Sequence, residues 1–176
     1  MPKEVAIPLI IVGSILGAWL LLLIVNLIFI GTYLHIFKKH KKALTVILYN
    51  KLENIKRIIS TMKQSGVDVD NKLIALANDI GENDFLEPGS QQYNKSRDVL
   101  SYLKDELMFQ ANKHSELNEH SEFLLAKNYV VESDVAYRNN VTMYNADVLG
   151  YNYWIRFLPC RFVFMMFRVK KKEIIS

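Results

Sequence analysis

A long apolar segment near the start of the chain constrains its fold more than any other feature. From Ala6 to Ile30 the sequence AIPLIIVGSILGAWLLLLIVNLIFI carries no charged side chain. At about 1.5 Å per residue, a helix of this length exceeds the roughly 30 Å hydrocarbon core of a bilayer. Cleaved secretory signals have a shorter apolar core and a small-residue cleavage motif, and neither is present. We therefore predict a transmembrane helix.

Basic residues on the two sides of this segment predict its orientation. Only Lys3 precedes it, whereas Lys38, Lys39, Lys41 and Lys42 follow it closely. Because basic flanks tend to remain inside, the N-terminus should be outside. We predict a single-pass protein of the cell (inner or cytoplasmic) membrane. Residues 1–37 would form the short extracellular N-terminus and the span, and residues 38–176 the cytoplasmic part.

The net charge of +4 favours an anionic bilayer surface over nucleic acid as a binding partner. The excess is mild, and the basic residues gather in two segments that are both expected near the membrane. A single cysteine, Cys160, excludes an internal disulfide framework. The residues predicted to contact the membrane surface are Lys38, Lys39, Lys41, Lys42, Arg161, Arg168, Lys170, Lys171 and Lys172.

The rest of the chain is patterned as helices, and no stretch alternates with the period of two that a strand requires. The apolar residues Leu48, Leu52, Ile55, Ile59 and Met62 form one seam, which predicts that the transmembrane helix continues as a stalk to about Gln64. We predict an all-α fold in which this helix enters a cytoplasmic antiparallel bundle of three to four long helices. Further helices are predicted from Asp68 or Asp70 to Asp79, at 96–114 and at 122–158, with a loop at 81–91 and a polar corner at 115–121.

The last predicted helix carries an apolar and aromatic stripe in heptad phase, with a coiled-coil-like spacing. Asn145 and Asn152 each follow a tyrosine of this stripe and should lie at its edge. We predict that they bond to a neighbouring helix and set its register. The stripe, with steps of four and three, consists of Tyr137, Val141, Tyr144, Val148, Tyr151, Ile155 and Leu158.

These residues resemble the terminal signature of the LemA family. YNADVLGYNYWIRFLP has tyrosine-asparagine repeated at seven, an aliphatic residue four after each tyrosine, and a closing proline. LYNKL, with Tyr49 and Asn50, resembles the family motif that follows the membrane anchor, whereas His114 and Ser115 replace a usual tyrosine and proline. We identify a divergent member, with the signature residues Tyr144, Asn145, Val148, Tyr151, Asn152, Ile155 and Pro159.

The resemblance implies a membrane protein with a cytoplasmic bundle of long antiparallel helices. No general catalytic activity is established for the family, so it implies no enzyme and no cofactor. We expect a non-enzymatic binding or scaffolding module at the cytoplasmic face of the membrane. Its expected partners are a second copy of the chain, other membrane-associated proteins, or both.

The segment HSELNEH invites a metal-site interpretation. Its two histidines, His114 and His120, are six positions apart and therefore on opposite sides of a helix. Neither HExxH nor HxxEH is present. We interpret the segment, including Glu116 and Glu119, as a polar corner. An enzyme would need a cleft that gathers both histidines and nearby carboxylates.

Two features of the sequence concern the membrane itself. Gly13 and Gly17 form a GxxxG pattern, and Asn26 adds a polar group that prefers a partner in lipid, so anchors of two chains would be able to associate.

The C-terminal tail FLPCRFVFMMFRVKKKEIIS alternates aromatic and basic residues. It either covers the end of the bundle core or lies at the inner leaflet, where a lipid-binding or membrane-shaping role would be the alternative function. An even number of cytoplasmic helices would return the tail to the bilayer, and three would leave it at the far end.

Overall fold

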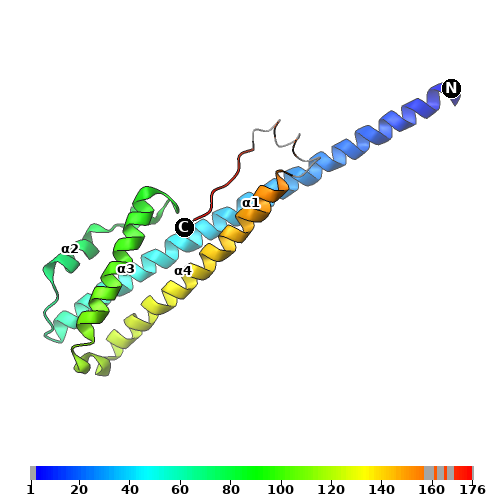
Figure 1. The fold of residues 1–176 in the computed structure, drawn as a ribbon. Coiled ribbons are helices and arrows are strands. Elements are labelled where there is room, and N and C mark those ends of the chain that lie inside the picture. Colours follow the sequence, from blue (N-terminus) through cyan, green and yellow to red (C-terminus); the bar gives the residue numbers. More distant parts are fainter. Residues whose placement is uncertain (1–2, 157–160, 162–164, 166–168, 176) are drawn as a thin grey trace. The chain divides into compact units, whose positions relative to one another are not determined.

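The computed structural model describes residues 3–156, 161, 165 and 169–175, and these residues are helical or irregular, without a strand (Figure 1). The chain divides into two compact units: residues 1–38 with 145–174, and residues 39–144 with 175–176. The helices are α1 (Lys3–Gln64), α2 (Asn71–Asp79), the 3-10 turn η1 (Glu82–Phe85), α3 (Gln91–Ala111), the 3-10 turn η2 (Ser115–Glu119) and α4 (Ser121–Trp154).

Helix α1 ends at the residue that the sequence predicts, and the cause is a glycine. Gly66 has a φ of +77°, a conformation that L side chains rarely adopt. The N–H of Gly66 donates to the carbonyl of Lys63, and the N–H of Val67 to that of Met62, which is the Schellman pattern. These bonds satisfy carbonyls at the end of the helix and turn the chain towards α2.

In the first unit, α1 is long and apolar enough to cross a membrane. Only 6% of its most apolar window is buried. Its exposed large side chains include Ile10, Val12, Leu16, Trp19, Leu20 and Ile28.

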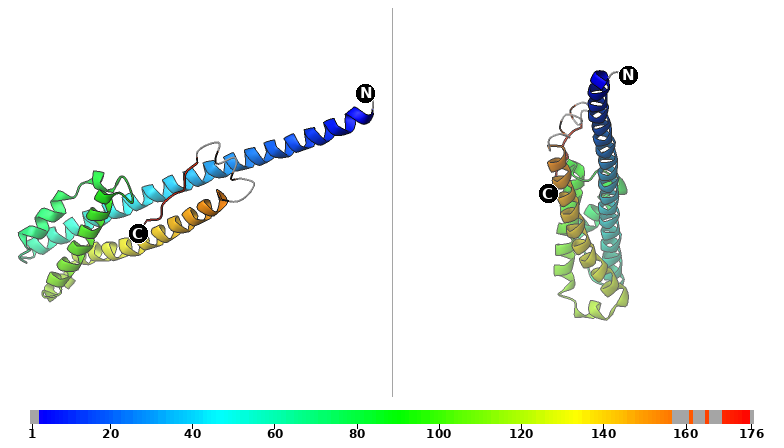
Figure 2. Two further views of the ribbon diagram at one scale, coloured as in Figure 1. Left: turned by 45° about the horizontal axis from the view of Figure 1, so that its top comes forward. Right: turned by 90° about the vertical axis from the view of Figure 1, so that its right-hand side faces the viewer.

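The second unit has a continuous apolar core. The stalk seam of α1 is buried throughout, and Leu100, Leu103, Leu107 and Ala111 of α3 are buried on one face, as their spacing predicts. Parts of α3 and α4 both lie beside the α1 segment of this unit (Figure 2). Further core residues are Val67, Val69, Leu73, Ala77, Phe85, Tyr93, Leu117, Phe123, Ala126 and Val130.

Within this unit α4 runs antiparallel to α1. The ring of His40 lies edge-on to Tyr144, at 6.5 Å between centroids. Beyond the other end of α1, the Oγ of Ser65 lies 3.3 Å from the Nε2 of His120. Residues late in α1 therefore meet residues early in α4.

N-terminal caps decide where two of the helices begin, and only for α3 does the start differ from the one that the sequence pattern predicts. Ser90 accepts the N–H of Tyr93 at 3.2 Å, so α3 begins at Gln91 rather than at Ser96. Asp70 caps α2 by accepting the N–H of Lys72 at 2.9 Å. The predicted loop at 81–91 contains η1, whose Phe85 is fully buried.

Candidate functional site

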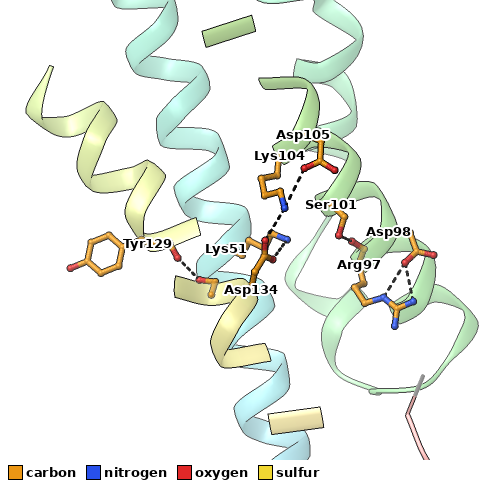
Figure 3. Close-up of polar contacts among 9 residues, drawn as sticks. Lys51, Arg97, Asp98, Ser101, Lys104, Asp105, Tyr129 and Asp134 are labelled. Carbon is orange, nitrogen blue, oxygen red and sulfur yellow. Dashed lines mark hydrogen bonds and ion pairs between the residues drawn. The ribbon is translucent and has the colours of Figure 1, made fainter. Parts of the chain in front are cut away.

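A half-buried carboxylate in the second unit joins three helices. One carboxylate oxygen of Asp134 in α4 accepts a hydrogen bond from the Nζ of Lys51 in α1 at 2.5 Å. The other oxygen accepts one from the Nζ of Lys104 in α3 at 2.9 Å (Figure 3). The Lys51 side chain is only 3% exposed. Asp134 follows Val130 by four positions and precedes Tyr137 by three, so it occupies a core position of the α4 stripe.

The surroundings keep this cluster charged. Burial alone would raise the pKa of Asp134, but the hydrogen bonds from Lys51 and Lys104 outweigh it and hold the pKa below its ordinary value. The hydrogen bond to Asp134 in turn raises the pKa of Lys104. A carboxylate with both oxygens occupied and a lowered pKa is a poor general base. We interpret the three residues as a device that fixes helix register.

A second polar contact joins α3 and α4 close to this cluster. The hydroxyl of Tyr93 lies 3.4 Å from that of Tyr137. Burial of Tyr93, and then its hydrogen bond to Tyr137, raise the pKa of Tyr93 above its ordinary value. The Tyr93 hydroxyl therefore remains protonated at neutral pH and acts as a hydrogen-bonding group.

A groove runs along the α1–α4 seam of the second unit. Its main cavity of about 640 Å³ is lined on α1 by the family-like residues Tyr49 and Asn50. Arg57 lines this cavity and a neighbouring one of about 240 Å³, so the two are adjacent. The side-chain oxygen of Asn54, in the larger cavity, is buried and has no hydrogen-bond partner among the described residues. The other lining residues of the larger cavity are Ile47, Glu53, Tyr129, Glu132, Ser133 and Ala136.

In the first unit, the end of α4 packs against α1 through aromatic side chains. The indole N–H of Trp154 donates to the side-chain oxygen of Asn26 at 3.3 Å. Trp154 also stacks on Phe29, at 4.5 Å between centroids. Tyr151 lies 5.7 Å from Tyr33, again between ring centroids. The approach is close enough that a Cβ at Gly150 would lie 3.2 Å from the Tyr33 hydroxyl.

Asn152 bonds to the tail of the chain rather than to a neighbouring helix. Its side-chain oxygen accepts the N–H of Lys172 at 3.0 Å, and its side-chain nitrogen donates to the carbonyl of the same residue at 2.8 Å. The hydroxyl of Tyr151 donates to the carbonyl of Lys170 at 3.4 Å. The sequence therefore identifies Asn152 as a pairing residue but assigns it a different partner.

The remaining signature residues have different surroundings. Asn145 and Val141 are half-buried, whereas four stripe residues are buried. Leu158 and Pro159 lie outside the described residues. The buried stripe residues are Tyr144, Val148, Tyr151 and Ile155.

The residues predicted for anchor association differ in their exposure. Gly13 and Gly17 are exposed, and a Cβ at either would meet nothing within 4 Å. Asn26 is only 1% exposed, and its amide nitrogen also donates to the carbonyl of Leu22. Asn26 therefore has its partners within the chain.

The predicted membrane-surface residues that the structure describes are all exposed. They are Lys38, Lys39, Lys41, Lys42, Arg161, Lys170, Lys171 and Lys172. Arg168 lies outside the described residues.

The HSELNEH segment does not gather its polar groups. His114 Nδ1 lies 3.0 Å from Glu116, whereas His120 contacts Ser65. Within the described ranges, no group of three or more His, Cys, Asp or Glu side chains is placed to hold a metal ion. Cys160 lies outside these ranges.

Sequence reasoning missed Asp134, Lys51, Lys104 and Trp154. A signal for Asp134 exists, since extending the heptad steps backwards from Tyr137 reaches it and then Val130. No family model, curated protein sequence or solved structure matches the chain. Over the part of the chain that the structure describes, the fold thus defines a class, an all-helical protein with one helix long and apolar enough to cross a membrane.

Proposed function

We propose that the chain is a LemA-like, single-pass membrane protein whose cytoplasmic antiparallel helical bundle is a non-enzymatic binding or scaffolding module. The observation that carries this proposal is the continuity of α1 from Lys3 to Gln64. One end of this helix exposes apolar side chains, and the other supplies the buried seam of the second unit. A helix of this kind ties a binding module to a bilayer.

The location and orientation belong to the same proposal. The chain lies in the cell (inner) membrane, with residues 1–37 forming the extracellular N-terminus and the span. The lysines after the span keep residues 38–176 in the cytoplasm.

Cysteine labelling tests this topology. In a Cys160→Ser background, a membrane-impermeant maleimide should label Lys3→Cys on intact cells, and Asn118→Cys only after permeabilisation. The opposite pattern contradicts the orientation. Recovery of the protein in the soluble fraction contradicts the span.

The groove along α1 and α4 supports the binding role. Its wall combines acidic side chains, such as Glu53 and Glu132, with the aromatic rings of Tyr49 and Tyr129. Such a mixture offers both hydrogen-bonding groups and flat apolar surface to a protein partner. The partner is another membrane-associated protein or a second copy of the chain.

Site-specific photocrosslinking in intact membranes tests the groove. A photoreactive residue in place of Glu132 should give a discrete crosslinked product. The same residue in place of Lys95, which is exposed on α3 and does not line the groove, is the matched control. Equal products from both positions would contradict a binding role for the groove.

A second candidate function is lipid binding or membrane shaping by the basic tail. The observation that favours it is the pairing of Asn152 with Lys172, which holds three exposed lysines, residues 170–172, beside α4. Lysines near a bilayer surface attract anionic headgroups.

Energy transfer in reconstituted vesicles tests this second candidate. In a Trp19→Phe chain, Trp154 should transfer energy more efficiently to a dansyl-labelled anionic lipid than to a dansyl-labelled neutral lipid. Replacing Lys170, Lys171 and Lys172 with glutamate should remove the difference. Persistence of the difference would exclude the three lysines as its cause.

A further inference from the structure

We propose that the last turns of α4, from Leu149 to Trp154, form a second membrane-contact site whose ligand is the boundary between phospholipid headgroups and hydrocarbon. The inference rests on the proposed membrane span. It concerns the side chains of α4 itself rather than the lysines of the tail.

The depth of this site follows from the contact between Trp154 and Asn26. Asn26 lies four residues before Ile30, where the long apolar segment ends, which is about 6 Å along a helix. The uncharged segment is longer than the roughly 30 Å hydrocarbon core requires, so its final turn reaches the headgroup boundary. The last turn of α4 lies at that same level of α1.

The chemistry of the contact suits this depth. Tryptophan and tyrosine are enriched at membrane interfaces because they combine an apolar ring with one polar group. The N–H of Trp154 is bonded to Asn26, and its ring stacks on Phe29. The polar atoms of this contact therefore have partners within the chain, as polar groups at that depth require.

The outer face of the same turns is apolar and uncovered. Leu149 is 64% exposed and Tyr153, one turn later, is 71% exposed. On α1, Leu27 and Ile28 are likewise exposed, and they follow Asn26 directly. Both helices thus present apolar side chains at one level of the first unit. A bilayer covers such a face on both helices at once, whereas water would leave it exposed.

The two tryptophans of the chain provide a direct test. Trp19→Phe leaves only Trp154, and Trp154→Phe leaves only Trp19, which lies near the middle of the predicted span. The full chain would be reconstituted in phospholipid vesicles that carry bromine either near the headgroup or near the end of the acyl chain. We expect shallow bromines to quench Trp154 more strongly, and deep bromines to quench Trp19 more strongly.

The outcomes separate this inference from the proposed span. If deep bromines quench Trp19 while Trp154 is quenched only by aqueous acrylamide, the second site is wrong and the span stands. If neither tryptophan responds to brominated lipid, the span itself is wrong. If lipid reaches Trp154 only when the protein is diluted in the bilayer, a second copy covers the face and the lipid assignment is overturned.

Discussion

Trp154 donates its indole N–H to the side-chain oxygen of Asn26, a residue 128 positions earlier in the chain, at 3.3 Å. An amide in apolar surroundings is costly unless it is hydrogen-bonded. Both polar atoms of the Asn26 side chain have partners, because its nitrogen donates to the carbonyl of Leu22. The side-chain amide of Asn26 therefore has all its hydrogen-bond partners within one chain.

This contact predicts energetic coupling between the two residues. In a double-mutant cycle of Asn26→Leu and Trp154→Phe, measured by unfolding in bicelles, we expect a coupling energy of about 0.6 kcal/mol and at most about 1.7 kcal/mol. The exposed Trp19→Phe, paired with Asn26→Leu, is the control and should be additive. Additive effects for Asn26 and Trp154 would contradict the bond.

Loss of the Asp134 carboxylate should destabilise the second unit. Asp134→Ala leaves Lys51 buried and unpaired, and we expect a loss of about 3 kcal/mol in the free energy of unfolding. Chemical denaturation followed by circular dichroism measures it. Asp98→Ala is the control, since Asp98 is 68% exposed, and it should change stability by at most about 0.5 kcal/mol.

A rescue variant separates a buried charge from a general packing defect. Replacing Lys51 with Met and Asp134 with Leu removes both charges, and we expect it to recover most of the stability lost in Asp134→Ala. A double variant as unstable as the single one would mean that the damage is not electrostatic.

Acid should weaken the same cluster. Because the folded-state pKa of Asp134 lies below the ordinary value of 3.8, its stabilisation is complete above that value and is lost as pH falls through the folded-state pKa. Asp134→Asn should therefore flatten the loss of stability at acidic pH. Unfolding free energies of both proteins, measured from neutral pH downwards, test this. Parallel curves would exclude Asp134 as a source of the acid response.

The pairing of Asn152 with Lys172 should protect the tail from protease. Asn152→Ala removes both hydrogen bonds, each of which contributes on the order of 1 kcal/mol. We expect faster tryptic cleavage at Lys170 to Lys172, followed by mass spectrometry. Asn139→Ala, an exposed asparagine of the same helix, is the control. Equal cleavage rates in both variants would show that Asn152 does not hold the tail.

The tyrosines of the α4 stripe should contribute more to stability than an exposed tyrosine of another helix. Tyr144 and Tyr151 are buried, so replacing either with Ala should cost about 2 to 5 kcal/mol in thermal or chemical unfolding. Tyr102→Ala on α3 is the control, because this tyrosine is 53% exposed and should tolerate the change. If Tyr144→Ala and Tyr151→Ala leave stability intact, the stripe is not a packing surface.

Much of the helical organisation could be predicted from local pattern. The seam from Leu48 to Met62 and the face from Leu100 to Ala111 are buried because a helix places residues three and four apart on one side. The starts of the helices were harder to predict. The α3 start depends on one hydrogen bond to Ser90, which hydrophobic periodicity does not report.

The candidate site was harder to predict than the helices, because it is formed by contacts between segments that are distant in the sequence. Asn152 could be identified as a pairing residue from its place beside Tyr151, but its partner Lys172 belongs to a tail without a helical pattern. The groove could not be predicted either. Tyr49 and Asn50 lie in one helix and Tyr129 in another, and only the pairing of α1 with α4 brings them to one cavity.

The sequence by itself determined the properties that depend on neighbouring residues: an apolar helix, a continuous stalk ending at Gly66, and a stripe with heptad spacing on the last helix. Tertiary structure alone decided which distant residues meet. Asp134 contacts Lys51 and Lys104, and Trp154 contacts Asn26, only because the packed helices have one particular register. The reason is physical, since periodicity specifies which side of a helix is buried but not which residue of another helix lies opposite.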